Sequence, residues 1–214
     1  MRRAHGVRSR TTTFLPMDEV LICRNTEGET VAEVDLDDTT LTLPEIVGQA
    51  RDRGADLVWA HGGNPGMDGF VRRPGYAHLH AERPESQERL PLVEAGLYGR
   101  LLARAYAGQW GHKWVDPTQS LPADGSVVLC LHEDGLPIGL CRVWPDHRLV
   151  DQPGVVPERR EAKHTLRLLG AACALLGPGP VDVDSWGESA PILEACGQLG
   201  FVVTQQQRGW ELRL

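Results

Sequence analysis

The sequence lacks the features that mark membrane proteins, metal-binding proteins and general nucleic-acid binders. No apolar run approaches the ~20 residues that a membrane-spanning helix needs. The five cysteines are scattered without a Cys-x-x-Cys pair, so a zinc or redox motif has no support, and their odd number fits a reducing compartment. The net charge of −7 has the wrong sign for a general nucleic-acid binder. We therefore expect a cytoplasmic protein whose partners include neither a membrane nor a nucleic acid.

What is present is the composition of a globular protein. Of the 214 residues, 41% are hydrophobic and 24% are charged, which is ordinary for a folded chain. This length fits one large domain or two small ones, and a core of that size needs no metal or disulfide. Residues 1–16 are rich in arginine and lack the apolar segment of a secretory signal, so we expect them to form a disordered tail.

Apolar periodicity and turn residues predict a similar series of elements twice. The first series has a hairpin, a helix and two strands, over 20–36, 44–53, 55–61 and 69–82. The second has a hairpin, an extended segment, a helix, a strand, a short helix and a closing strand or two, over 127–144, 149–158, 159–176, 181–186, 189–200 and 201–214. A Gly-Phe-Val triplet opens a late strand in each series, which indicates a duplicated unit.

We divide the chain on this basis into the tail over 1–16, a shortened copy over 17–83 and a complete copy over 84–214. The shortened copy contains GGNPGMD where the other has a second helix. The complete copy begins with residues 84–126, in which apolar residues near helical spacing predict one or two amphipathic helices.

Two runs of the complete copy resemble the GNAT superfamily of N-acetyltransferases. The first, GLPIGLCRVWPDHRLVDQPGVVPERREAKHTLRLLGAACALL, passes from the hairpin through a Val-x-Pro strand end into a long helix. The second, SWGESAPILEACGQLGF, is similar to the family's fifth strand, fourth helix and the Gly-Phe before the sixth strand. The resemblance implies an α/β fold with a central mixed, mostly antiparallel sheet flanked by helices.

Acetyl-CoA is the cosubstrate that this resemblance implies. The family motif is Arg or Gln, two residues, Gly, one residue, and Gly or Ala, and it brings backbone N–H groups of a helix start close to the pyrophosphate. Aligned from Pro157, this sequence has Arg160 at the basic position but Lys163 and Thr165 at the glycine positions. The implied binding residues are Val155, Val156, Pro157, Arg159, Arg160, Lys163, His164 and Thr165.

This departure from the motif has two interpretations, which both stay open at the level of sequence. Arg159, Arg160 and Lys163 hold the anion by charge; cations at a helix start oppose its dipole by roughly 0.3–1 kcal/mol each, so three of them indicate a bound anion. Alternatively, the phosphate site has been lost and the fold serves another purpose.

The resemblance also implies groups that transfer the acetyl unit to an amine. Many GNAT enzymes have a tyrosine as general acid where this sequence has Cys196. The candidate general bases are Asp151, Asp184 and Glu188, and His147 is another. In the family the fourth and fifth strands split to admit the pantetheine arm, and a backbone N–H, here of Val155 or Val156, holds the thioester carbonyl.

Two histidines, His78 and His80, are candidate metal ligands. The period-two spacing of His78 and His80 places both on one face of a strand. A metal would need a third ligand, for which His61 is the only loose candidate, so we expect no metal site.

Together these features favour an acetyl-CoA-dependent N-acetyltransferase that acts on a small-molecule or peptide amine. The alternative is a GNAT-like binding or structural module without activity, which the loss of both loop glycines and of the tyrosine suggests. A homodimer is also conceivable, because open sheet edges of this fold invite pairing.

Overall fold

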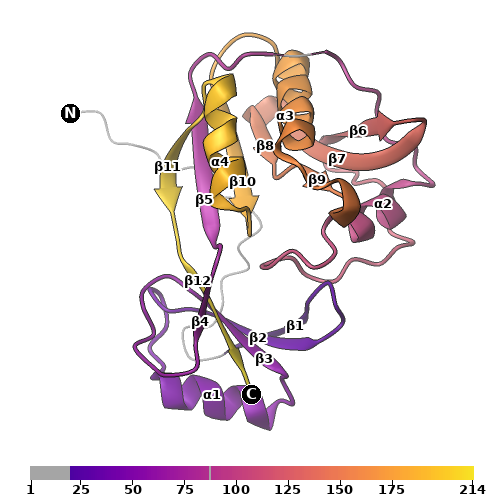
Figure 1. The fold of residues 1–214 in the computed structure, drawn as a ribbon. Coiled ribbons are helices and arrows are strands. Elements are labelled where there is room, and N and C mark those ends of the chain that lie inside the picture. Colours follow the sequence, from indigo (N-terminus) through magenta and orange to yellow (C-terminus); the bar gives the residue numbers. More distant parts are fainter. Residues whose placement is uncertain (1–19, 87) are drawn as a thin grey trace.

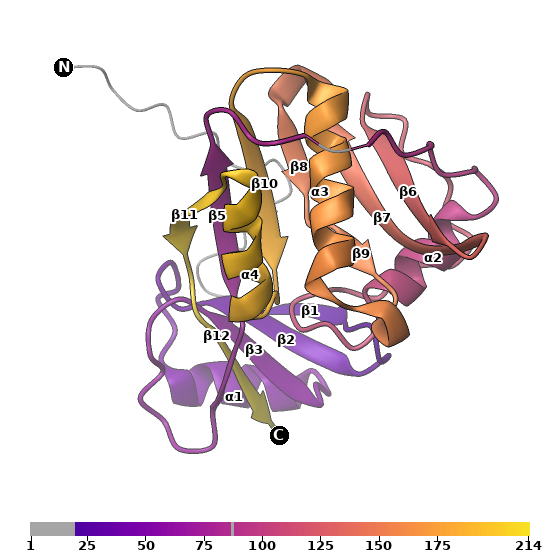
Figure 2. The ribbon, with the colours of Figure 1, turned by 45° about the horizontal axis from the view of Figure 1, so that its top comes forward.

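The computed structural model describes residues 20–86 and 88–214, which build two sheets (Figures 1 and 2). The small sheet contains β1 (Leu21–Arg24), β2 (Thr30–Asp35), β3 (Leu57–His61), β4 (Val71–Arg73) and β12 (Gly209–Arg213). The large sheet contains β5 (Tyr76–Ala81), β6 (Val127–Glu133), β7 (Leu136–Trp144), β8 (Leu149–Asp151), β9 (Gly154–Val155), β10 (Val181–Trp186) and β11 (Val202–Gln206). The α-helices are α1 (Leu43–Asp52), α2 (Tyr98–Ala105), α3 (Ala162–Leu176) and α4 (Ala190–Cys196).

Both sheets are mixed and mostly antiparallel, which confirms the expected α/β fold class. The strand order is β1-β2-β3-β12-β4 in the small sheet and β11-β5-β10-β8-β7-β6 in the large one, where β9 also pairs with β7. The parallel pairs are β2–β3 and β8–β10. A parallel pair needs a crossover connection, and α1 and α3 supply it. Helices α3 and α4 cover one face of the large sheet, and α2 lies on the other side near β7 (Figure 2).

Each sheet contains one strand from a distant part of the chain. The small sheet is otherwise N-terminal and contains the C-terminal strand β12, and the large sheet is otherwise C-terminal and contains β5. Strand β5 follows β4 of the small sheet but lies between β10 and β11, antiparallel to both. Strand β12 follows β11 of the large sheet but lies between β3 and β4. The strand expected over 69–82 is therefore two strands in different sheets, and the boundary expected after residue 83 does not separate the two sheets.

The two connections between the sheets cross in contact at Gly75. The Gln207 N–H donates to the Tyr76 carbonyl at 2.8 Å, and the Gly187 N–H donates to the Gly75 carbonyl at 3.1 Å. A Cβ atom on Gly75 would lie 2.7 Å from backbone atoms of Arg208 and Gly209, closer than real Cβ contacts. The chain therefore passes between the sheets at a position that only glycine fits.

Trp110 packs where the two sheets meet. Its ring centroid lies 5.4 Å from that of Trp59 and 5.3 Å from that of His61, both on β3. A Cβ atom on Gly209 would lie 2.5 Å from Cζ3 of the Trp110 ring, and one on Gly187 would overlap the Trp110 backbone. Glycines on β12 and directly after β10 thus make the space that Trp110 fills.

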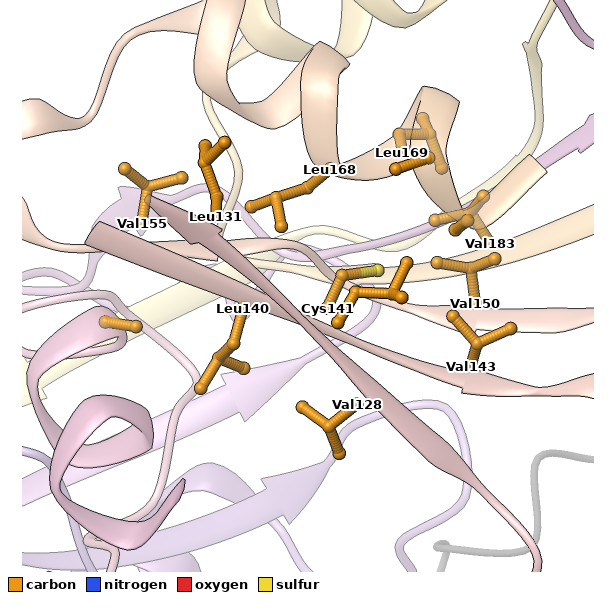
Figure 3. Close-up of a cluster of buried hydrophobic side chains, with 14 of the residues drawn as sticks. Val128, Leu131, Leu140, Cys141, Val143, Val150, Val155, Leu168, Leu169 and Val183 are labelled. Carbon is orange, nitrogen blue, oxygen red and sulfur yellow. The ribbon is translucent and has the colours of Figure 1, made fainter. Parts of the chain in front are cut away.

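The main core lies between α3 and the large sheet (Figure 3). Leu168 and Leu169 of α3 are fully buried and point toward sheet residues that include Val150, Val155 and Val183. On the opposite face of the sheet, α2 packs against β7 and β9. A separate cluster of buried side chains fills the space between α1 and the small sheet.

Local sequence sets several element boundaries as expected. The Asp134–Gly135 turn of the β6–β7 hairpin has φ of 51° and 75°, the left-handed conformation of a type I′ turn. At the start of α1, Oε2 of Glu45 accepts the Thr42 N–H at 2.8 Å, one of the two bonds of a capping box.

The one or two helices expected over 84–126 are found as one short helix, α2, and the other described residues of this segment form loops and turns rich in proline and glycine. Two other expectations about helices need correction. Helix α3 begins at Ala162 and not at residue 159, because Pro157–Arg159 form a 3₁₀ turn. The helix expected over 189–200 is the shorter α4, which ends at Cys196, and residues Gly197–Leu199 after it form a 3₁₀ turn. Within the described residues, no helix has the length and apolar character to cross a membrane.

The crossing at Gly75 gives a first prediction. Gly75→Ala should lower the free energy of unfolding by roughly 3 kcal/mol or more, because the backbone atoms that meet the new methyl group cannot move aside. Gly48→Ala is the matched control: Gly48 is exposed in α1 with open space around it, so alanine should raise stability by roughly 0.5–1 kcal/mol. Denaturant unfolding measures both, and a Gly75→Ala protein as stable as the unmodified chain would contradict this account.

Candidate functional site

The large sheet splits at the end of β8. Strands β8 and β10 are paired in parallel only as far as Asp151 and Asp184. Beyond them β9 pairs with β7 alone, while β10 continues to Trp186. The structure thus has a split at the place where the resemblance implies the entry of a pantetheine arm.

The side chain of Gln152 fills this split. Gln152 is fully buried, with no exposed surface. Its Oε1 accepts the Trp186 backbone N–H at 2.5 Å, and its Nε2 donates to Oε1 of Glu188 at 2.8 Å. The Tyr106 hydroxyl donates to the Gln152 carbonyl at 2.5 Å. One side chain therefore links the two strands that diverge.

Residues after α2 complete a polar network around Gln152. Nε2 of His112 lies 3.1 Å from Oε1 of Gln152, and the His112 ring stacks on Tyr106 with centroids 4.1 Å apart. Burial lowers the pKa of His112 to about 4, so the ring is neutral at pH 7 and its Nε2–H donates. Nε2 of Gln109 also donates to Glu188, at 3.1 Å. The network satisfies its buried polar groups, which is the condition for such a network to be stable.

Arg160, the expected pyrophosphate contact, bonds instead to backbone carbonyls. One terminal nitrogen donates to the carbonyls of Ala105 and Ala107, each at 3.0 Å, and Nε donates to the Val155 carbonyl at 3.3 Å. Its guanidinium joins the end of α2 to the free side of β9.

The other two basic residues near the start of α3 face acids. Arg159 lies 3.3 Å from Glu133, and Lys163 lies 3.2 Å from Glu161, which is at the N-cap position of α3. These exposed pairs contribute little stability, yet they balance the local charge that was expected to hold an anion.

The motif's remaining positions include two buried side chains, His164 and Thr165. His164 is 1% exposed; its ring lies 2.6 Å from the Arg159 carbonyl and 3.2 Å from a Glu133 oxygen. Thr165, at the second glycine position of the motif, is 3% exposed. Pro157 begins the 3₁₀ turn, and the Val156 N–H donates to Ile138 at 2.9 Å, so it is not free to hold a thioester carbonyl. The two glycine positions of the motif therefore carry an exposed lysine and a buried threonine.

The candidate bases Asp151 and Asp184 are brought together as neighbours across β8 and β10. Burial raises the pKa of Asp151 to about 6, and the nearby Asp184 adds to the shift. Asp184 accepts hydrogen bonds from the Tyr76 hydroxyl at 2.5 Å and from Nδ1 of His78 at 2.9 Å. Asp184 is thus held by hydrogen bonds to two side chains of β5, whereas Asp151 is the carboxylate whose pKa is raised by burial.

Glu188 lies apart from this pair, in a cleft of about 410 Å³ between the two sheets. The cleft is also lined by Trp59, Trp110, Arg73 and Arg160. Burial raises the pKa of Glu188, although the amides of its neighbours oppose the shift. Glu188 and Gln109, which bond to each other, both line the cleft and belong to the network in the split.

Cys196, at the position of the family's general acid, is 5% exposed on α4. Burial raises the pKa of its thiol to about 11. The thiol packs within the main core, as a small apolar side chain does.

A ladder of acids and histidines, which sequence analysis missed, lies across β5 and β10. Each imidazole bridges two carboxylates: His78 lies 2.9 Å from Asp184 and 3.3 Å from Asp182. His80 lies 2.7 Å from Asp182 and 3.5 Å from Glu82. We call this set, with the Tyr76 hydroxyl at its end, the acid–histidine ladder. The two motifs His-x-His and Asp-x-Asp could have indicated it, but only the strand exchange makes them neighbours.

The ladder does not amount to a metal centre. Among the residues that the structure describes, no group of three or more histidine, cysteine or acidic side chains is arranged to hold a metal ion. His61, the third ligand considered, belongs to β3, where its Nε2 lies 3.2 Å from Glu33.

Comparison with solved structures identifies the fold. A GCN5-related N-acetyltransferase from Anabaena variabilis aligns with 90% of this chain and 58% of its own length, at 10% identity and a TM-score of 0.52. A Pyrococcus horikoshii protein described as an acetyltransferase aligns with 80% of this chain and 58% of its own, at 13% identity and 0.52. A GCN5-related N-acetyltransferase from Kribbella flavida aligns with 87% of this chain and 82% of its own length, at 15% identity and a TM-score of 0.49. No protein-family profile and no curated protein sequence matches.

The first two likenesses show that the chain has the GNAT fold, as its sequence motifs suggested. This chain spans 58% of the length of either protein. A fold supports many activities, so what those proteins do is not carried over to this chain by the fold alone.

The ladder gives a prediction about pH. A hydrogen bond to Asp182 is the main cause that raises the pKa of His80 above its ordinary value of 6.5. The bond's contribution to stability is therefore complete below pH 6.5 and is lost as pH rises through the folded-state pKa. The facing strand β11 carries no charged residue that would alter this sign.

We expect the free energy of unfolding to fall across this pH window in the unmodified chain and to fall less in His80→Gln. Denaturant unfolding at a series of pH values measures the difference, with His147→Gln, at an exposed 3₁₀ turn, as the matched control. Identical pH profiles for His80→Gln and the unmodified chain would show that the ladder adds nothing to stability.

Proposed function

We propose that this chain is a GNAT-fold binding module that does not take acetyl-CoA into the split between β9 and β10. The observation that carries the proposal is the buried Gln152 side chain, which occupies the space implied for the pantetheine arm. A pantetheine arm would have to expel Gln152 and leave partners such as Glu188 and the Trp186 N–H unpaired. Each buried polar group left unpaired costs about 1–3 kcal/mol.

The start of α3 supports the same proposal. A pyrophosphate needs free cations or close backbone N–H groups. Here Arg160 is engaged with carbonyls, Arg159 and Lys163 face glutamates, and neither glycine of the motif is present. Glu133 and Glu161 beside them would repel phosphate.

The cleft between the sheets supports a binding role. It is lined by aromatic side chains and by charges of both signs, and it lies outside the filled split. Arg73 pairs with Glu211 at 2.8 Å and Arg213 with Glu29 at 3.0 Å, so its polar walls are held in place. Concave sites with aromatic walls and a few fixed polar groups are typical of ligand binding.

Titration calorimetry with acetyl-CoA tests this proposal. We expect no binding by the unmodified chain at about 1 mM acetyl-CoA, because the split and the start of α3 are occupied. A variant that combines Gln152→Ala, Lys163→Gly and Thr165→Gly should gain affinity if folding is retained, which circular dichroism checks. Saturable binding by the unmodified chain, abolished by Arg160→Glu, would overturn the proposal.

A second candidate function is the acetyl-CoA-dependent N-acetyltransferase of an amine. The observation that favours it is Asp151, at the start of the split, with a pKa raised to about 6. A general base works best with a pKa near the working pH, and in this role Asp151 would accept the proton from the attacking amine.

Turnover across a panel of small and peptide amines with acetyl-CoA tests this candidate. If it holds, kcat/KM should increase as pH rises through about 6, because the ionised carboxylate is the active form. Asp151→Asn should lower kcat/KM by about 10²–10⁴-fold, whereas Asp146→Asn, at an exposed turn, should leave it unchanged. The absence of turnover with every amine would remove this candidate.

A further inference from the structure

The two sheets have four outer edges, and the chain itself covers two of them. Along β6, the Val93 N–H donates to Val128 at 2.9 Å and the Cys130 N–H donates to Pro91 at 2.8 Å. Along β1, the Trp114 N–H donates to Arg24 at 2.8 Å. These segments occupy backbone groups that an edge strand otherwise offers to another chain.

The third edge, β4, is guarded by its composition. It is only three residues long and contains Arg72 and Arg73. Short strands and positive charges are among the devices by which proteins keep sheet edges from pairing with other molecules.

The fourth edge, β11, has neither kind of protection in the described part of the chain. Its sequence Val-Val-Thr-Gln-Gln contains no charge and no proline, and each of its residues is exposed. Val202 is 60% and Val203 is 43% exposed. Within residues 20–86 and 88–214 it pairs with β5 on one side only, so no strand of this part of the chain bonds to the backbone donors and acceptors on its other side.

We propose that β11 pairs with β11 of a second copy, antiparallel across a two-fold axis. Two identical edges joined in this way form a closed dimer, the commonest form of soluble oligomer. With the axis at Thr204, Val202 faces the partner's Gln206 and Val203 faces the partner's Gln205. No like charges then meet, and the exposed valines gain cover, which favours a second copy over a charged partner strand.

The register limits the strength of this dimer. The pairing of β11 with β5 shifts between Val203 and Gln205, and such a bulge bends the strand. The pairing is therefore short and buries less than the ~1,200 Å² of a standard interface, so the dimer should be weak and depend on concentration.

Sedimentation velocity of the full chain over a wide concentration range tests the proposal. We expect a reversible monomer–dimer equilibrium. Thr204→Lys should raise the dimer dissociation constant about tenfold or more, because it places two lysines opposite each other at the axis. Leu136→Lys is the matched control: Leu136 is 66% exposed in the β6–β7 hairpin at the other end of the sheet, and its replacement should change nothing.

Cross-linking gives a second readout that does not depend on Thr204→Lys folding correctly. Thr204→Cys should form a disulfide-linked dimer under mild oxidation, and Leu136→Cys should not. Monomer at all concentrations, or a dimer that Thr204→Lys leaves intact and Thr204→Cys does not cross-link, overturns the proposal. Neither result bears on acetyl-CoA binding, so this test is independent of the proposed function.

Discussion

The packing of Trp110 between the two sheets is the contact on which the rest of the structure depends. Its ring packs on Trp59 and His61 of the small sheet, while Gly187 and Gly209 provide the space on either side. Because strands β5 and β12 are exchanged, neither sheet is complete without the other part of the chain. Fixing the two sheets at this point therefore fixes both cores, and it also positions the neighbours of Trp110 in the sequence. Gln109 and His112, which flank it, reach into the split and contact the network around Gln152.

That network lies at the split in the large sheet. The split between β9 and β10 is an intrinsic feature of the strand arrangement, since β8 and β10 separate after Asp151 and Asp184. An open split would expose unpaired backbone groups, and a cosubstrate that satisfies them is one solution. Here Gln152 accepts the Trp186 N–H and the guanidinium of Arg160 donates to the Val155 carbonyl, so two of these groups are bonded from within the chain. The fold is retained, while the chemistry that it can host depends on which groups line the split.

The exchange of strands also creates features that neither half contains alone. The acid–histidine ladder pairs histidines of β5 with aspartates of β10, residues that lie about a hundred positions apart in the chain. The cleft between the sheets combines Trp59 of β3 with Glu188, which follows β10. In both cases the N-terminal and the C-terminal parts of the chain each contribute residues. The exposed edge at β11 arises in the same way. Because β5 lies between β10 and β11, strand β11 is the outermost strand of the large sheet.

Local sequence determined the elements whose boundaries depend on nearby residues. The hairpin at Asp134–Gly135 needs left-handed residues in its turn, and α1 begins at a threonine followed by proline and glutamate. The family motifs likewise indicated the GNAT fold and drew attention to Lys163 and Thr165 as departures from it. Tertiary structure alone decided which sheet each strand joins, that Gln152 lies in the split, and which groups bind the side chains of Arg159 and Arg160. These depend on contacts between residues far apart in the chain, and a strand's own sequence does not specify the edge beside which it lies.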